Sequence, residues 1–452
     1  MATTGEMQAR AGLLDPAANV YFSSVFDSGN GVLMGGEVPE SGPVVARVSI
    51  AKEPFTEGTD KRHHKQWFYF QLSNVLGRAC QVELHVGETS YPDAWTGYWA
   101  TYSIDQVNWL RAPTQYDAER LTVTFNVEAL TANRVYFAYF TPYAYEQHRQ
   151  LVAEVVQGLG KVPAFQAQHE VVAQSVQGRD IDLFRFGTGP LQVWIIARQH
   201  PGESMAEWYM QGLLKELLAA DPAGDIAALL QQVTLNLVPN MNPDGSFLGH
   251  LRTNAVGANL NREWGATGDY AAPTLERSPE VYGLCQKLER VGCDLFMDVH
   301  GDEELPHIFF AGTQGVPRWS PRLAVLYHQF TAAQLKASPH FQTKHGYGND
   351  EPGKANLAIC GDAVAQRYDC LAVTLEMPFK AVLREPDMVR GWNPERIHAF
   401  AATLFPTLTQ VAPMLRAEFP FPNVECNPAQ LPDWTQPGYE NPPSEEVWPT
   451  TA

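Results

Sequence analysis

The sequence lacks the patterns that mark several common classes of protein. Its 452 residues include six cysteines, but none are spaced as Cys-x-x-Cys, so neither a thiolate zinc site nor a dithiol redox motif is expected. The first 20 residues contain no apolar segment typical of a signal peptide, and runs such as residues 193–197 are too short to cross a bilayer. We therefore expect a cytoplasmic protein with no membrane span and with reduced, mostly buried thiols.

Positive charge is also scarce. The chain contains 32 lysine and arginine residues against 50 aspartate and glutamate residues, which gives a formal net charge of -18. Nucleic acids and anionic membranes bind basic surfaces, so we expect neither as a partner. Apolar residues make up 45% of the chain and charged residues 18%, which is typical of a globular protein. At about 150 residues per domain, this length indicates two or three domains.

Two parts of the chain follow different hydrophobic patterns. In the first part, segments such as 80–86 and 121–127 alternate apolar and polar residues, as antiparallel strands do. From about residue 180, apolar strands alternate with helical stretches, which is typical of an α/β domain. A single amphipathic helix is expected over residues 393–416. We predict an antiparallel β domain, an α/β domain and a proline-rich tail, over residues 1–145, 146–418 and 419–452.

Polar residues follow the apolar strands of the second part. His200, His300 and Glu376 each come directly after or near the end of such a strand. In an open α/β sheet, ligands bind beyond the carboxyl ends of the strands. His200 and Glu203 have the His-x-x-Glu spacing of a zinc hydrolase, and His300 from a distant strand can complete a set of three ligands. Catalytic zinc sites of this kind keep a fourth position for water, whose pKa the metal lowers to about 7.

Other residues fit the remaining needs of amide hydrolysis. Glu376 is expected to act as the general base, because burial at the end of an apolar strand raises the pKa of a carboxyl group toward the working range. Arg252 could stabilise the developing oxyanion. Asn261 and Arg262 could bind a carboxylate, since the guanidinium group of Arg262 presents a planar fork of donors.

Two alternative functions belong to other classes. The segment Gly-Glu-Ser-Met-Ala at residues 202–206 is one residue short of the Gly-x-Ser-x-Gly elbow of a serine hydrolase, with Ser204 as the nucleophile. Asp298 and His300 lie too close together to supply its usual partners, although Asp369 and His398 offer another pair, and Ala206 in the last position weakens the motif. The other alternative is a peptide-binding protein that has lost catalysis, although every principal catalytic position is filled.

Five segments of the second part, HPGE, NPDG, NLNREW, DVHG and VTLEMPF, resemble the zinc carboxypeptidases of the M14 type. Within that group, residues 66–75 and 137–148 resemble the β domain of the cytosolic carboxypeptidases. The resemblance implies a mixed eight-stranded sheet flanked by helices and preceded by the β domain. Acylamino-acid deacylases of the same superfamily share His-x-x-Glu, but the NPDG segment and the β domain favour a peptidase.

The resemblance also implies a role for each site residue. One zinc ion would be bound by His200, Glu203 and His300, and Glu376 would be the general base and acid. Arg252 would polarise the scissile carbonyl group. The carboxylate at the C-terminus of a peptide or protein tail would be held by the pair Asn261 and Arg262.

The chain departs from the family pattern beside one of the expected zinc ligands. Asn259 stands where many members have an aspartate that orients the first histidine, and an amide adds no negative charge to support the metal. Tyr347 and Tyr368 are the candidates for the mobile tyrosine of the secreted members. Lys354 and Arg367 are the candidates for a basic pocket that would select an acidic C-terminal residue.

Overall fold

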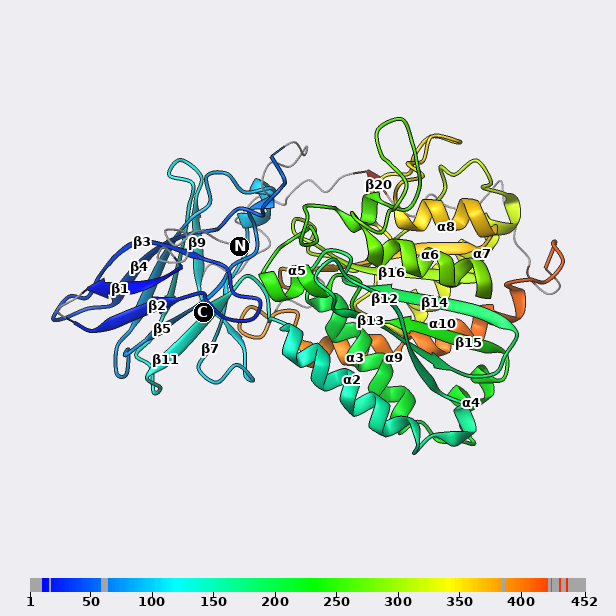
Figure 1. The fold of residues 1–452 in the computed structure, drawn as a ribbon, viewed down its shortest axis with the longest axis horizontal. Helices are drawn as coiled ribbons and strands as arrows, with labels where there is room; N and C mark the ends of the chain where they lie inside the picture. The colour runs from blue at the N-terminus through cyan, green and yellow to red at the C-terminus, as the bar shows by residue number, and fades with distance from the viewer. Residues whose placement is uncertain are drawn as a thin grey trace.

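In a computed structural model, the chain forms two lobes that lie side by side (Figure 1). The first lobe consists mainly of strands, and the second contains a sheet covered by helices. Most of the expected tail, residues 419–452, lies outside the part of the chain that the structure describes. The domain boundaries expected at residues 145 and 418 stay predictions. The structure describes residues 10–15, 18–57, 64–383 and 387–421, with Val424, Leu431, Gln436 and Pro437.

The first lobe is a sandwich of two sheets. Phe125 of one sheet packs against Phe68 and Phe137, whose rings lie at centroid distances of 6.1 and 5.5 Å, and these contacts join the two layers. All described pairs are antiparallel except β4 with β6, so the predicted antiparallel domain contains one parallel pair. One sheet has the order β1 (Ala11–Asp15), β2 (Val20–Ser23), β5 (Tyr69–Ser73), β11 (Arg134–Ala138), β7 (Thr101–Ser103) and β8 (Leu110–Arg111). The other has the order β3 (Val32–Glu37), β4 (Val44–Ser49), β6 (Cys80–His85), β10 (Thr122–Val127) and β9 (Thr114–Asp117).

The second lobe contains the mixed sheet that the sequence predicted. Its order is β12 (Gln168–Gln174), β13 (Asp180–Phe186), β15 (Val233–Val238), β14 (Leu191–Ala197), β16 (Leu295–Asp302), β19 (Leu371–Pro378) and β17 (Phe309–Ala311). The four strands from β15 to β19 are parallel, and the other pairs are antiparallel. The sheet has seven strands within the described residues rather than eight. Next to β17, Ile308 and Phe341 form only an isolated bridge, which is too short to count as a further strand.

Helices cover both faces of this sheet. Val193 and Ile195 of β14 belong to one core, and Trp194 and Ile196 to the other, which explains why the strand reads as a continuous apolar run. No helix among the described residues is long and apolar enough to span a bilayer. The first core is covered by α2 (Tyr145–Leu159), α3 (Met205–Ala219), α4 (Asp225–Leu230), α7 (Pro321–Ala337), α9 (Pro394–Ala402) and α10 (Leu404–Val411). The second is covered by α6 (Pro279–Val291) and α8 (Cys360–Tyr368).

The single helix expected over residues 393–416 is divided into α9 and α10 at Thr403. Pro406 explains the break, because proline has no N–H to donate to residue 402 and its ring clashes with that carbonyl group. Asn393 caps the first of the two helices by accepting a hydrogen bond from the N–H of Arg396. The five cysteines within the described residues are buried and free, as expected.

The two lobes share an interface of hydrogen bonds and apolar contacts. The Arg111 guanidinium donates to the Phe379 carbonyl oxygen at 2.7 Å, and the rings of Tyr139 and Phe379 lie 4.6 Å apart. The backbones also approach closely at Gly249, between α5 (Pro243–Leu248) and the segment that carries Arg252. A Cβ atom on Gly249 would lie 2.4 Å from the carbonyl oxygen of Gly29. Side chains other than hydrogen are therefore excluded at this point of the interface.

A buried ion pair fixes the start of α3 against the sheet. The Glu207 carboxylate, which is fully buried, accepts hydrogen bonds from Arg198 Nη1 at 2.5 Å and Asn240 Nδ2 at 3.0 Å. It also lies 2.6 Å from His148 Nδ1 on α2. The Arg198 guanidinium binds the Pro201 carbonyl oxygen as well, so this cluster holds the turn that leads to the candidate site.

We predict that Glu207→Ala lowers the free energy of unfolding by about 3–5 kcal/mol, because it leaves the buried charge of Arg198 without its anionic partner. Urea denaturation measures the change. Glu289→Ala is the control, since Glu289 forms an exposed pair with Arg367 at 3.4 Å. Loss of that pair is expected to cost about 1 kcal/mol or less. Equal losses in the two variants would contradict the prediction.

Candidate active site at the strand ends

Parallel pairing of three strands brings distant parts of the chain together. β14 pairs with β16 so that Ile196 lies opposite Asp298, and β16 pairs with β19 so that His300 lies opposite Glu376. Beyond the end of β14, the chain turns through His200 before α3 begins. The ends of all three strands therefore meet at one edge of the sheet, where the sequence predicted a binding site.

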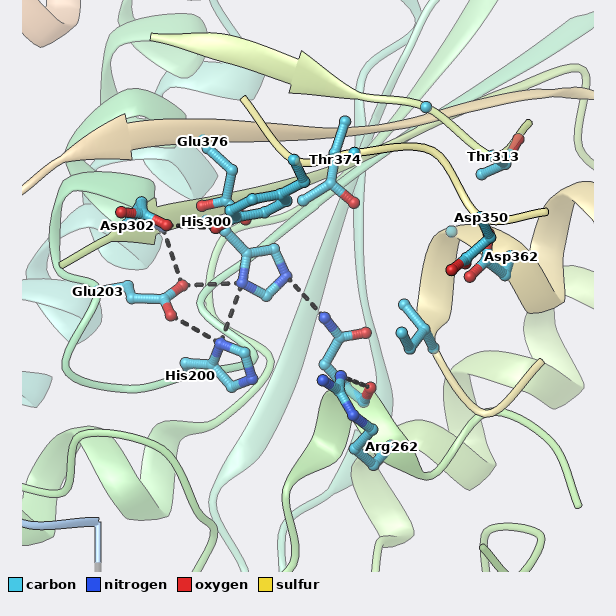
Figure 2. Close-up of a pocket in the computed structure, with 18 of the residues that line it drawn as sticks. His200, Glu203, Arg262, His300, Asp302, Thr313, Asp350, Asp362, Thr374 and Glu376 are labelled. Carbon is cyan, nitrogen blue, oxygen red and sulfur yellow. Dashed lines mark hydrogen bonds and ion pairs between the residues drawn. The ribbon is translucent and has the colours of Figure 1, made fainter. Parts of the chain in front are cut away.

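Three of the predicted residues form a tight buried cluster (Figure 2). One ligand atom from each of His200, Glu203 and His300 lies within 4.8 Å of the other two. Nδ1 of His200 is 2.7 Å from Glu203 Oε1, and Nδ1 of His300 is 2.8 Å from Glu203 Oε2. The two Nδ1 atoms are 3.2 Å apart. With these distances, the Nδ1 atoms of both histidine rings face the Glu203 carboxylate.

The far sides of the two histidine rings have different partners. Nε2 of His300 lies 2.6 Å from the Asp298 carboxylate, whereas Nε2 of His200 lies 3.0 Å from Oδ1 of Asn259. The same Asn259 oxygen accepts the backbone N–H of Asn261, which fixes the orientation of the amide. His200 must therefore donate from Nε2. In the neutral ring, Nδ1 then carries a lone pair that faces the carboxylate oxygen of Glu203 at 2.7 Å, and a proton or a metal ion between these two acceptors would stabilise the contact.

Burial and nearby charge set the protonation of the cluster. Burial, followed by the positive charge of Arg252, lowers the pKa of His200 to about 3, so the ring is neutral at pH 7 and can act as a ligand. Burial also lowers the pKa of His300, but the Asp298 and Glu203 carboxylates outweigh it and hold that pKa well above its usual value. Metal binding displaces protons from its ligands, so a divalent cation would replace the proton on His300.

Two imidazole nitrogens and one carboxylate are a donor set that suits zinc with an open coordination position. The site therefore fits the metal that the sequence predicted. The amide of Asn259 gives His200 an acceptor without charge, while the carboxylate of Asp298 gives His300 a charged one. The two histidines therefore differ in the charge of their partners because Asn259 stands where many family members have an aspartate.

The cluster opens into a cavity of about 400 Å³ that also holds the other predicted residues. Glu376 is 6% exposed, and its Oε2 atom has no hydrogen-bond partner among the described residues. Burial raises the pKa of Glu376 well above its usual value. Arg252 and Arg262 line the cavity, and Asn261 is held in its wall, where its Oδ1 accepts the Cys360 N–H at 2.9 Å.

The structure gives no support to Ser204 as a nucleophile. Its side chain is fully buried, and its hydroxyl donates to the Thr141 carbonyl oxygen at 2.8 Å. The backbone of Ser204 has α-helical dihedrals, with φ -63° and ψ -21°, rather than the strained geometry of a nucleophile elbow. Ser204 therefore belongs to the packing of α3 against the first lobe.

The secondary candidates divide between the cavity and the outside. Tyr347 lines the cavity and donates to Asp302 Oδ2 at 2.5 Å, whereas Tyr368, the last residue of α8, lines a separate pocket. Lys354 and Arg367 are exposed and lie outside the cavity wall. They cannot form the basic pocket for which they were candidates.

Sequence reasoning missed the residues at the other end of the cavity, which are Thr313, Asp350 and Asp362. None of them follows a predicted strand, so strand-end reasoning could not find them. Thr374 had a usable signal. It precedes Glu376 by two residues on β19, and alternation along a strand puts both side chains on the same face.

Two family models match the chain. Residues 22–140 match the cytosolic carboxypeptidase N-terminal domain, and residues 161–395 match the zinc carboxypeptidase of the M14 type. An uncharacterized protein of Zymomonas mobilis is 42% identical over 335 residues, which are 73% of this chain and 83% of that protein. Cytosolic carboxypeptidase 6 of Caenorhabditis elegans is 25% identical over 388 residues, which are 80% of this chain and 79% of the relative.

Solved structures agree with these matches. A metallo-carboxypeptidase from Pseudomonas aeruginosa, in complex with (2-guanidinoethylmercapto)succinic acid, is 39% identical with a TM-score of 0.78, covering 87% of this chain and 100% of that one. A metallo-carboxypeptidase from Burkholderia cenocepacia is 37% identical with a TM-score of 0.77, covering 86% and 98%. The resemblance read from the sequence is thus confirmed. The chain belongs to the M14 family of zinc carboxypeptidases, and it is a metallocarboxypeptidase with the N-terminal domain of the cytosolic carboxypeptidases.

Proposed function

We propose that the chain binds one zinc ion through His200, Glu203 and His300 and hydrolyses the last peptide bond at free C-termini of peptides or protein tails. The observation that carries this proposal is the 2.7 Å approach of His200 Nδ1 to Glu203 Oε1, where two acceptors face each other beside His300. A cytoplasmic location is part of the proposal and is supported by the cytosolic carboxypeptidases among the relatives.

Each remaining residue has a task that its position allows. Zinc, when bound, lowers the pKa of water to about 7 and polarises a carbonyl group. The Glu376 carboxylate accepts a proton from the attacking water and returns it to the leaving amine. The Arg252 guanidinium donates hydrogen bonds to the carbonyl oxygen as negative charge develops there.

Recognition of the C-terminus is assigned to Arg262 with Asn261. The guanidinium of Arg262 lines the cavity, and its N–H groups can form paired hydrogen bonds with a carboxylate. The ligand of the Pseudomonas structure is a succinic acid derivative, so that relative accommodates carboxylates. A carboxylate fork of this kind fixes the register of the scissile bond in an exopeptidase and would serve no purpose in an endopeptidase.

We predict that Glu376→Gln lowers kcat by about 100-fold or more, because the variant cannot transfer the proton. Its zinc content, measured by atomic absorption, should stay at one ion per chain. His300→Ala is the comparison and should lose zinc as well as activity. Near-normal turnover of Glu376→Gln would refute its role. Absence of peptide hydrolysis in the zinc-loaded wild type would favour the peptide-binding alternative, and loss of turnover in Ser204→Ala with zinc retained would revive the serine hydrolase.

We predict that Arg262→Ala lowers kcat/KM about 10- to 100-fold on peptides with a free carboxylate, since a charge-assisted hydrogen bond is lost. Lysine at this position should restore only part of the activity, because it cannot present the planar fork. The measurement is hydrolysis of one peptide in free-acid and amidated forms. Equal cleavage of the two forms by the wild type would overturn the assignment as a carboxypeptidase even if zinc is present.

A further inference from the structure

The cavity has two chemically different ends (Figure 2). The cluster of His200, Glu203 and His300 lies at one end, and the carboxylates of Asp350 and Asp362 lie together at the other. The guanidinium of Arg262, which would hold the substrate carboxylate, belongs to the same cavity. A C-terminal residue bound with its carboxylate on Arg262 would therefore extend its side chain away from the metal ligands and toward the two aspartates.

Small residues make room for a side chain at this acidic end. A Cβ atom on Gly361 would lie 3.5 Å from Thr313 Cγ2 and 3.7 Å from Thr374 Oγ1, so the glycine leaves open space between them. A Cβ atom on Gly315 would lie 2.4 Å from Cβ of Asp350, so only glycine there permits the position of Asp350. The end of the cavity is therefore shaped as a pocket rather than closed by side chains.

Asp362 and Thr313 are the buried polar residues of this pocket, whereas Asp350 beside them is exposed. Asp362, in the first turn of α8, is 7% exposed and has no hydrogen bond or ion pair with the described residues. The Thr313 hydroxyl, on a side chain that is 4% exposed, has no partner there either. Burial, followed by the charge of Asp350, raises the pKa of Asp362 to about 7. A buried carboxylate without a partner is costly, and a cationic ligand would relieve that cost.

We propose, on the basis of the proposed function, that this pocket selects a lysine or arginine at the C-terminus of the substrate through Asp362 and Asp350. The ammonium or guanidinium group lies between the two carboxylates. A C-terminal glutamate would place a third carboxylate beside these two. Among the described residues that line the cavity, the lysine and arginine side chains are Arg252 and Arg262, and both have other tasks in the reaction.

The test compares peptides that differ only in their last residue, which is lysine, arginine, leucine or glutamate. The zinc-loaded full chain should cleave the lysine and arginine peptides with kcat/KM about 10- to 100-fold above the leucine peptide, the range expected for a charge-assisted pair. Asp362→Asn should abolish most of that preference, so that kcat/KM for the lysine peptide falls toward the value for the leucine peptide in the same variant. Asp269→Asn, which removes an exposed aspartate outside the cavity wall, should change neither value.

The pH dependence gives a second readout. Asp362 faces Asp350 and Arg262, and its carboxyl group is neutral below its pKa of about 7. The preference for lysine over leucine should therefore rise between pH 6 and pH 8, while the lysine side chain stays charged throughout. Asp362→Asn should make the ratio independent of pH in this range.

The affinities of L-arginine and L-norleucine, measured by calorimetry, test the pocket independently of catalysis. Tighter binding of arginine, lost in Asp362→Asn, supports the pocket even if no peptide is hydrolysed, and that outcome would overturn only the catalytic assignment. Equal cleavage of lysine and leucine peptides, or preference for glutamate, would overturn the pocket while the carboxypeptidase stands. Equal binding of the two amino acids would overturn it as well.

An independent observation concerns the first lobe, whose Glu53 reaches the segment that carries Arg252. Glu53 Oε1 accepts the backbone N–H groups of Leu251 and Arg252 at 2.5 and 2.8 Å. Its Oε2 accepts the N–H and the hydroxyl of Thr253 at 2.9 and 2.6 Å. All four contacts bring donors to one buried carboxylate, so the path of the backbone at Arg252 is set by a residue of the β lobe.

We infer that Glu53 is a positioning residue for Arg252. Glu53→Gln keeps the size of the side chain but turns an NH₂ group toward N–H donors, which shifts the loop. A displacement of about 1 Å can cost up to 100-fold in rate, so kcat should fall by about 10- to 100-fold with KM little changed. Zinc content should be retained. It is measured because the Leu251 carbonyl oxygen also binds the Gly202 N–H at 2.8 Å.

A double-mutant cycle distinguishes positioning from a general loss of stability. In the Arg252→Ala background, Glu53→Gln should change kcat by less than about twofold, because the group it positions is already absent. Ser28→Ala is the control, since it removes another hydrogen bond between the lobes, from Ser28 Oγ to the Ser246 carbonyl oxygen. It should leave kcat near the wild-type value. Losses that multiply in the double variant, or an equal loss in Ser28→Ala, would overturn the inference.

Discussion

Parallel pairing of β14, β16 and β19 is the constraint on which the site depends. Because these strands run in one direction, the residues after their carboxyl ends share one edge, and the register places His300 directly opposite Glu376. A shift of one residue would turn one of these side chains into the opposite core. Close packing on both faces of the sheet resists such a shift, so the core that stabilises the lobe also fixes the candidate metal ligands relative to Glu376.

The positions of the charged residues say more about the site than the net charge of the chain does. The formal net charge of -18 gives no indication of where the acidic residues lie. Several of them line one cavity, and the arginines among its described lining residues are Arg252 and Arg262. The carboxylates of the cavity lie at both of its ends, with Asp302 and Glu303 beside the histidine cluster and Asp350 and Asp362 at the other end.

Much of the fold could be predicted because it depends on local patterns. The apolar runs that became β14, β16 and β19 are long enough to read as strands covered on both faces, and the residues after them are polar and few. The break at Thr403 could also have been anticipated from Pro406. The eighth strand was expected from the resemblance alone and not from a hydrophobic pattern. At the edge of the sheet, the structure has only a single bridge at Phe341.

The parts that could not be predicted depend on contacts between distant segments. Lys354 and Arg367 precede Glu376 in the chain just as Asp362 does, and only the fold shows that Asp362 faces the cavity while the two basic residues face outward. Glu53 had no motif at all, because its partners are backbone N–H groups, which every sequence supplies. Sequence patterns identify residues whose side chains react, but they do not reveal residues that act on the main chain of another segment.

The contact of Gly249 with the Gly29 carbonyl oxygen has a consequence for how the molecule responds to heat. The two lobes meet there without side chains between them, and one continuous apolar cluster runs through both. Melting of the β lobe would therefore expose apolar surface of its neighbour and release the backbone near Arg252. We therefore expect turnover to be lost when the first lobe melts, although the candidate metal ligands and Glu376 all lie in the second lobe.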